Sequence, residues 1–142
     1  MNGKQSKWAL NELTLWLANR GWTIKFRPRC KDEAWFDTKQ MTISLDATAE
    51  HRIFTILHEC GHIIAGGKRA VYELVYTSTA KKKTDWYKIL RVVNEVRAWD
   101  AGERLATRLG IFIDRNGYAA YRARYLKKYM RWAITSPKKK NR

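Results

Sequence analysis

The stretch FTILHECGHIIAGG, residues 54–67, constrains this chain more than any other part of its sequence. Apolar residues surround a polar group of His58, Glu59 and His62, and two glycines follow, which is a common signal for the end of a helix. In a helix, His58 and His62 lie one turn apart on the same face, where both imidazoles can reach one metal ion. The segment therefore predicts a buried or half-buried helix that carries a metal site. A pair of ordinary packed histidines is the alternative.

Glu59 follows the first histidine and points to the edge of the same helix face. In an H-E-x-x-H helix this carboxylate does not bind the metal but acts on the attacking water and carries its proton. Glu59 is therefore the candidate general base of a hydrolytic site.

A catalytic zinc takes three protein ligands and leaves one position for water, so a third ligand is needed. His51 does not qualify, because it precedes His58 by two helical turns, about 10 Å along the axis. A long predicted helix ending at Gly110 offers Glu95, which falls on its apolar stripe. The stripe consists of Val92, Val96, Trp99, Ala106 and Leu109. A carboxylate on a buried face is costly unless it is paired or bound to metal, so Glu95 is the candidate third ligand. A buried salt bridge to an arginine is the alternative.

The other patterns predict an α+β fold made of a few short elements. The expected elements are a helix at 7–20 closed by Gly21, strands at 22–28, 33–38 and 41–46, the histidine helix capped by Asp46 or Thr48, the long helix capped by Thr84 or Asp85, and a last helix at about 115–134. We expect a three-stranded, mostly antiparallel sheet beside the histidine helix, with the glutamate helix packed against it. Residues 67–84 indicate an edge strand or a packed loop. Residues 1–134 are expected to form one domain, and 135–142 a basic flexible tail.

The positive charge of the chain is large and uneven. The formal net charge is +16, and residues 111–142 alone hold ten Lys or Arg against one acid, Asp114. This balance predicts an acidic partner, either nucleic acid or an acidic protein, bound through Lys127, Lys128 and Arg131 of the basic C-terminal helix. A solvated face that keeps the protein in solution is the alternative. The same helix carries an aromatic stripe, which usually packs in a core. The stripe is formed by Tyr118, Tyr121, Tyr125, Tyr129 and Trp132.

The two cysteines and the lack of long apolar runs bear on location. No segment is long and apolar enough for a membrane span or a signal peptide, so no membrane partner and a cytoplasmic location are expected. Cys30 and Cys60 should then be reduced, with Cys60 a packed residue beside the site.

HECGH followed 32 residues later by NEVRAWD resembles the gluzincin metallopeptidases, in which two histidines come from one helix and a glutamate from the next. The short length and the preceding strands are similar to the minimal gluzincins of the ImmA/IrrE type, which are found in bacteria and their phages. In that family the second helix often reads N-E-x-x-A, and Asn94, Glu95 and Ala98 match it. The resemblance covers roughly residues 35–110 and implies a small zincin-like domain. It implies four site residues, His58, His62 and Glu95 as Zn²⁺ ligands and Glu59 as general base.

The chain also departs from this family. Larger gluzincins often carry an Asp four residues after the ligand glutamate to orient a histidine, and here Trp99 takes that position, with Asp100 next. The third histidine of the metzincins is absent, because Lys68 stands in its place. The SprT-type proteases, which also combine a small H-E-x-x-H domain with basic regions, are the alternative family.

The resemblance implies a zinc metalloendopeptidase that hydrolyses peptide bonds of an intracellular protein, in the host cytoplasm or in a virion if the protein comes from a phage. Tyr72 and Tyr76 are candidates for stabilising the oxyanion. The alternative function is a basic nucleic-acid-binding protein, or a phage structural or assembly protein, with a structural or vestigial zinc. A structural site would need a fourth protein ligand, for which Cys30 is the candidate.

Overall fold

The computed structural model describes residues 1–66 and 85–135. The elements in these ranges are α1 (Gly3–Ala18), β1 (Thr23–Arg27), β2 (Glu33–Trp35), β3 (Gln40–Ser44), α2 (Ala49–Ile64), α4 (Asp85–Leu109) and α5 (Arg115–Ile134). This is the expected α+β class. The expectation for residues 67–84, and all but the first residue of the expected tail, lie outside the described residues.

The three strands form a mixed sheet in the order β1-β3-β2, so the expectation of a mostly antiparallel sheet was wrong. β2 and β3 form the expected antiparallel hairpin, whose turn contains Lys39 with a positive φ of 53°. β1, however, pairs with β3 in parallel over all five of its residues. The chain passes from β1 over to the far side of the sheet, and β3 then returns between the other two strands. β1 and β2, which follow one another in the sequence, are therefore not neighbours in the sheet, and β2 lies at an edge of the sheet formed by the described residues.

α1 begins four residues earlier than expected, because Asn2 forms a capping box with Gln5. Leu13, Trp16 and Leu17 are buried as predicted, but Trp8 is 47% exposed. At the other end, Gly21 has a φ of 79° and closes the helix in the left-handed conformation. α1 therefore packs next to β1 and α2 through a face that includes Ser6 and Ala9 but not Trp8.

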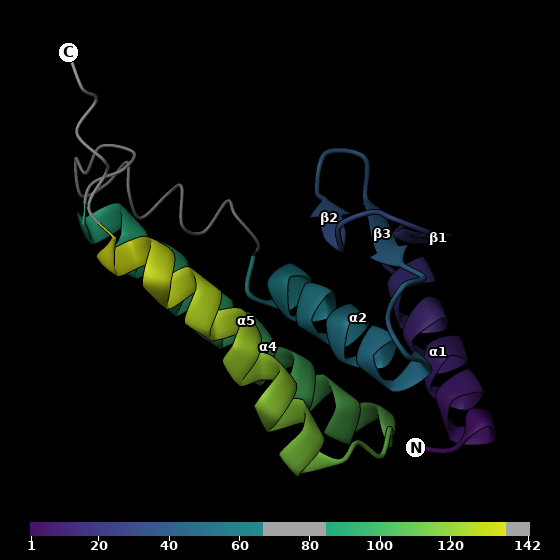
Figure 1. The fold of residues 1–142 in the computed structure, drawn as a ribbon. Coiled ribbons are helices and arrows are strands. Elements are labelled where there is room, and N and C mark those ends of the chain that lie inside the picture. The colour runs from purple at the N-terminus through teal and green to yellow at the C-terminus, as the bar shows by residue number, and fades with distance from the viewer. Residues whose placement is uncertain (67–84, 136–142) are drawn as a thin grey trace.

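α2 is the central element of the molecule (Figure 1), lying between the α4–α5 pair on one side and α1 with the sheet on the other. Thr48 caps its first turn, and all ten of its residues from Ile53 to His62 are buried. A helix that is covered on every side must contain its polar groups within the core, where each of them needs a partner. His58, Glu59 and His62 are thus placed inside the protein by the packing of α2.

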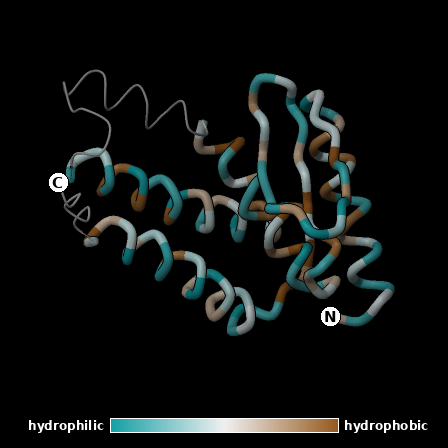
Figure 2. The backbone as a smooth tube through the Cα atoms, turned by 45° about the horizontal axis from the view of Figure 1, so that its top comes forward, coloured by the Kyte–Doolittle hydropathy of each residue, from teal (hydrophilic) through white to brown (hydrophobic). Residues whose placement is uncertain are grey.

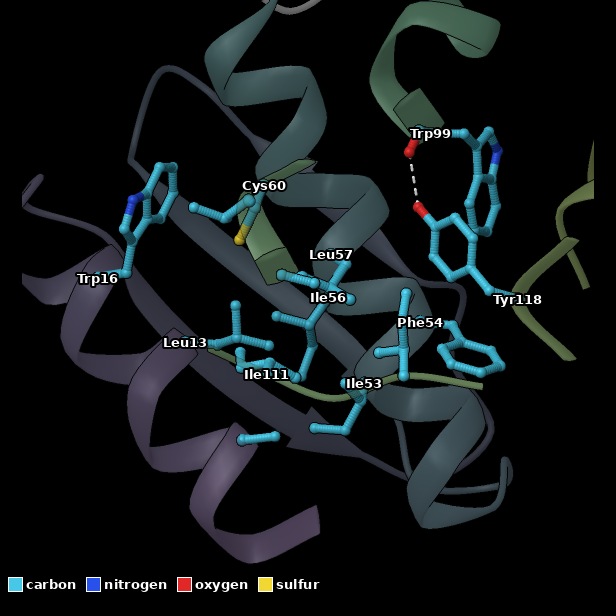
Figure 3. Packing of buried hydrophobic residues seen from close by; sticks show 14 of the residues in the cluster. Leu13, Trp16, Ile53, Phe54, Ile56, Leu57, Cys60, Trp99, Ile111 and Tyr118 are labelled. Atoms are coloured by element: carbon cyan, nitrogen blue, oxygen red, sulfur yellow. Dashed lines mark hydrogen bonds between the residues drawn. The ribbon is translucent and has the colours of Figure 1, made fainter. Parts of the chain in front are cut away.

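The core surrounds α2 (Figure 3), with Leu13 and Trp16 of α1 on one side and Trp99 and Tyr118 on the other. The hydroxyl of Tyr118 donates a 2.6 Å hydrogen bond to the carbonyl oxygen of Trp99, which ties α5 to α4. Cys60 is fully buried in this core, so its expected packing role is confirmed. Along α4 and α5, hydrophobic and hydrophilic residues alternate at helical spacing (Figure 2), and none of the described helices combines the length and apolar character that a bilayer crossing requires.

α2 and α4 approach each other closely enough for backbone contact. A Cβ atom on Gly61 would lie 1.8 Å from the carbonyl oxygen of Ala98, and one on Gly102 would lie 2.4 Å from that of Leu57. Glycine at both positions is therefore required by the crossing itself. The buried face of α4 is centred on small residues here rather than on the predicted apolar stripe. Its members are Asn94, Glu95, Ala98, Trp99, Ala101, Gly102, Leu105 and Ala106.

Candidate metal centre

The crossing of α2 and α4 brings together His58, His62 and Glu95. The Nε2 atoms of His58 and His62 lie 2.8 and 3.2 Å from the same carboxylate oxygen, Oε2 of Glu95. One donor atom from each residue lies within 4.8 Å of the other two, and all three side chains are buried. Among the described residues Glu95 pairs with the two histidines and with no arginine, which was the alternative expectation for its buried carboxylate.

The spacing of these donor atoms suits a small divalent ion. Zinc bonded at about 2.0–2.1 Å in tetrahedral geometry separates two of its ligand atoms by roughly 3.3 Å. The two nitrogen–oxygen distances, 2.8 and 3.2 Å, are close to that value. Two imidazoles with one carboxylate are also a ligand set that leaves one position for water. The three residues therefore fit a metal ion in both spacing and chemistry.

The protonation of the group follows from burial and from mutual contact. Burial alone would raise the pKa of Glu95, but its hydrogen bonds with the two histidines hold that pKa far below its usual range. Burial also disfavours the charged form of His62, yet the hydrogen bond and the charge of Glu95 outweigh it and raise the pKa of His62. Protons and a metal ion therefore compete for the same nitrogen.

Glu59 lies beside the three residues without joining them. One of its oxygens is 3.6 Å from Nδ1 of His58, and the side chain is buried. Burial raises the pKa of Glu59, the two imidazoles oppose this, and the nearby carboxylates of Glu95 and Asp32 add to it. A carboxylate whose pKa is raised in this way is a better proton acceptor when it is ionised.

Trp99 supports His58 by stacking. Its ring lies 4.2 Å from that of His58 at an interplanar angle of 7°. Asp100 turns away and accepts a 2.6 Å hydrogen bond from Arg122, so it does not orient a histidine. Nδ1 of His62 has no hydrogen-bond partner among the described residues. The orientation of the two imidazoles therefore depends on packing and on Glu95.

A cleft of about 200 Å³ leads to the three residues. Its sheet side is formed by residues 31–34 and Phe36, and its helical side includes Arg91, Tyr125 and Tyr129. The Tyr125 hydroxyl is 3.5 Å from Asp32, whose other carboxylate oxygen accepts a 2.7 Å hydrogen bond from the Ser44 backbone.

Tyr129 lies next to Glu95 in this cleft. Burial raises the pKa of Tyr129 to about 12, so its hydroxyl keeps its proton at neutral pH and remains a donor. The sequence predicted Tyr125 and Tyr129 as core members of the aromatic stripe, and Asp32 was not singled out. In the structure Tyr118 and Tyr121 are buried, whereas Tyr125 and Tyr129 are half-buried and Trp132 is exposed, so the predicted core role holds only for the first part of the stripe.

Other candidate residues lie apart from the group. His51 stacks on Tyr121 with ring centroids 4.5 Å apart. It lies outside the metal group, as expected from its distance along the helix. Cys30 donates a hydrogen bond to the carbonyl oxygen of Arg27 and does not belong to the group, so among the described residues no fourth protein ligand is at hand. Tyr72 and Tyr76 lie outside the described residues. The three α5 cations predicted to contact an acidic partner are exposed, and they are Lys127, Lys128 and Arg131.

The group as a whole can hold a divalent metal ion with a proton-accepting carboxylate beside it and open space in front. Three buried ligand atoms converge, Glu59 is adjacent, and the cleft gives access. We compared the chain with models of known protein families, with curated proteins and with solved structures, and none of them matches it.

Proposed function

We propose that the protein is a zinc-dependent metallopeptidase of the gluzincin type, similar to the ImmA/IrrE peptidases, which hydrolyses peptide bonds of a protein substrate. One observation carries the proposal: the Nε2 atoms of His58 and His62 converge on Oε2 of Glu95, and Glu59 faces the same cleft without being a ligand. A purely structural zinc site would fill its fourth position with another protein atom, and Cys30 is bonded elsewhere.

In this proposal each side chain has a separate task. His58, His62 and Glu95 hold the ion, which when bound would make a water more acidic and polarise a carbonyl group. Glu59 accepts the proton of the attacking water and delivers it to the leaving amine. Tyr129, protonated and next to Glu95, is a donor for the developing oxyanion, a role for which the sequence had offered Tyr72 and Tyr76.

The position of the edge strand β2 is an argument for a peptide as the substrate. β2 lies at the edge of the described sheet, and its residues Glu33 and Ala34 line the metal cleft. An extended peptide can add to such an edge through backbone hydrogen bonds, which bind it regardless of its side chains. The scissile bond would then lie between β2 and the histidine helix.

The test combines metal content with hydrolysis. Wild type, Glu59→Gln and Glu95→Ala are each treated with a chelator, reloaded with zinc and measured by elemental analysis. Hydrolysis is followed by mass spectrometry on a broad mixture of peptides, so that no substrate need be known in advance. We expect about one zinc per chain in wild type and in Glu59→Gln, a sharp loss in Glu95→Ala, and hydrolysis in wild type alone. Hydrolysis that survives in Glu59→Gln would refute the general-base role, and full zinc binding by Glu95→Ala would refute the ligand assignment.

Binding of nucleic acid is the second candidate function, favoured by the exposure of Lys127, Lys128 and Arg131 on one helix. Contacts to phosphates release counterions, so binding of this kind weakens steeply as salt rises and is nearly independent of sequence. An anisotropy titration with single- and double-stranded DNA at two salt concentrations tests it. The triple Gln variant of these residues should bind more weakly with a flatter salt dependence, while its zinc content stays unchanged.

A further inference from the structure

A second pocket of about 340 Å³ adjoins the metal cleft at the end of the α4–α5 pair. Arg91 and Tyr129 line both spaces, and the remaining walls are formed by Tyr87, Lys128 and Trp132. The pocket and the cleft therefore adjoin each other at the side chains of Arg91 and Tyr129. A molecule bound at the metal centre reaches this pocket by passing over these two side chains.

The pocket is positively charged, in contrast to the other side of the cleft. Arg91 and Lys128 are its ionisable cations, and Lys88 adds a third charge nearby, with Nζ 5.7 Å from the centre of the Trp132 ring. The sheet side of the cleft instead has a net negative charge, since the carboxylates of Asp32 and Glu33 outnumber the ammonium group of Lys31. A negatively charged group is thus repelled at one side of the metal centre and attracted at the other.

Arg91 is placed to bind such a group. It lies one helical turn before Glu95 on α4, so its side chain reaches the cleft from the same face as the ligand. Among the described residues, no carboxylate lies within ion-pair distance of Arg91 or of Lys128. A guanidinium presents donors that match a carboxylate at two points. The rings of Tyr129 and Trp132 provide apolar walls for the carbon atoms that carry the carboxylate.

We propose that this pocket is a substrate subsite that selects a carboxylate of the bound peptide, with Arg91 as the main specificity-determining residue. The carboxylate comes either from an Asp or Glu side chain or from the free C-terminus. This inference rests on the proposed peptidase function and names its substrate class. The pocket favours a peptide over nucleic acid because it adjoins the proposed hydrolytic cleft, and because Lys127 and Arg131 of α5 are not part of its lining.

The test reads the pocket directly by NMR on the full chain, in a Glu59→Gln background so that peptides are not cut. The indole N–H of Trp132, identified by Trp132→Phe, reports occupancy, and Trp8, Trp16 and Trp22, which line neither space, serve as internal controls. Four probes are titrated into the millimolar range. They are a doubly blocked peptide with one Glu, the same peptide with Gln, the Gln peptide with a free C-terminus, and a short single-stranded oligonucleotide.

We expect a saturable shift at Trp132 with at least one carboxylate-bearing peptide and none with the blocked Gln peptide. The peptide that binds identifies the source of the carboxylate. Arg91→Gln should weaken binding roughly tenfold or more, as expected for the loss of a charge-assisted hydrogen bond, and Arg91→Lys should restore part of it. Arg97→Gln is the matched control, because Arg97 is exposed on the same helix and lines neither space.

Several results would overturn the subsite. These are equal shifts with Glu and Gln peptides, equal affinities of Arg91→Gln and Arg97→Gln, no shift with any probe, and an Arg91-dependent shift caused by the oligonucleotide alone. The readout requires neither zinc nor turnover. If zinc-loaded wild type cuts no peptide, the proposed peptidase function is refuted. The carboxylate-dependent shift at Trp132 can still be observed in that case, so the failure of one proposal is distinguishable from the failure of the other.

Discussion

Replacing Gly61 by alanine tests whether the crossing of α2 and α4 positions the metal ligands. The new Cβ atom would lie 1.8 Å from the carbonyl oxygen of Ala98. Carbon and oxygen in contact need about 3.3 Å, so the two helices must separate by roughly 1.5 Å at this point. Glu95 lies one turn from Ala98 on α4 and moves with it, away from His58 and His62.

Two energies oppose each other in this variant. Alanine is favoured over glycine inside a helix by about 1 kcal/mol, whereas overpacking of a tight contact costs about 1–3 kcal/mol and occasionally more. The atom that obstructs Cβ belongs to the backbone and cannot rotate away, so the upper part of that range applies. We expect a net loss of about 1–2 kcal/mol in the free energy of unfolding of the chelator-treated protein.

The effect on the metal should be larger than the effect on the fold. Metal–ligand distances tolerate deviations of about 0.2 Å, and the separation required by Gly61→Ala is several times greater. We expect zinc to bind roughly 100-fold more weakly, the upper end of what misplaced ligand support costs. The dissociation constant is measured by competition with a chromophoric chelator, and stability by urea unfolding.

Gly3→Ala is the matched control, because a Cβ at Gly3 would meet no atom within 4 Å. It should leave the zinc affinity unchanged and stabilise α1 slightly. If Gly61→Ala loses stability as expected but binds zinc like wild type, the helix crossing does not set the position of Glu95 and the reasoning is refuted.

Four further predictions concern protonation and the surroundings of the metal group. The raised pKa of His62 stabilises the metal-free fold fully below pH 6.5, and this stabilisation is lost as pH rises, whereas the lowered pKa of Glu95 stabilises the fold above pH 4.5. Zinc needs neutral imidazoles, so protons compete with it less as pH rises. The increase in Tm on adding zinc, measured by differential scanning fluorimetry, should therefore grow from pH 6 to pH 8. Glu59→Gln should raise the Tm of the chelator-treated protein at pH 8, where wild type must bury an ionised carboxylate, and a lower Tm would contradict that reasoning. Trp99→Ala should cost about 3–5 kcal/mol in urea unfolding and weaken zinc binding, because it removes a buried ring stacked on His58. Asp100→Asn should change unfolding by less than about 1 kcal/mol and leave the zinc affinity unaltered, since its partner is a partly exposed arginine.

The sequence predicted the helices well because their ends carry local signals. Gly21, Gly66 and Gly110 all have positive φ and stand where the expected helices end. The order of the strands was not predictable in the same way. The turn before β3 specified a hairpin, but nothing local to β1 shows that β3, and not β2, lies beside it. Strand pairing at a distance depends on packing across the whole sheet, which short patterns do not contain.

The candidate ligands were predictable from spacing, whereas the residues that surround them were not. Glu95 was noticed because it interrupts an apolar stripe, yet that stripe is not the most buried face of α4. Val92, Val96 and Leu109 are only half-buried, since the small residues at 98, 101 and 102 allow α2 to approach along a different line. A pattern of large apolar residues identifies a face that avoids water, but a close helix crossing is made by small residues. For that reason Gly61 and Gly102 were not recognised as determinants of the site.

Acidic and basic residues are distributed unevenly around the candidate metal site. The chain has 13 acidic residues against 29 basic ones, yet four of the acids, Asp32, Glu33, Glu59 and Glu95, line one small cleft. Burial of carboxylates lowers stability unless a cation compensates. In a chain with so many lysines and arginines, direct pairing with them would be the simple solution, but Glu95 faces two imidazoles instead. The buried Glu95 thus lies beside two imidazoles that can lose their protons, and this arrangement suits a metal ion. The cations Arg91 and Lys128 lie in the adjoining pocket, and that arrangement suits an anionic group.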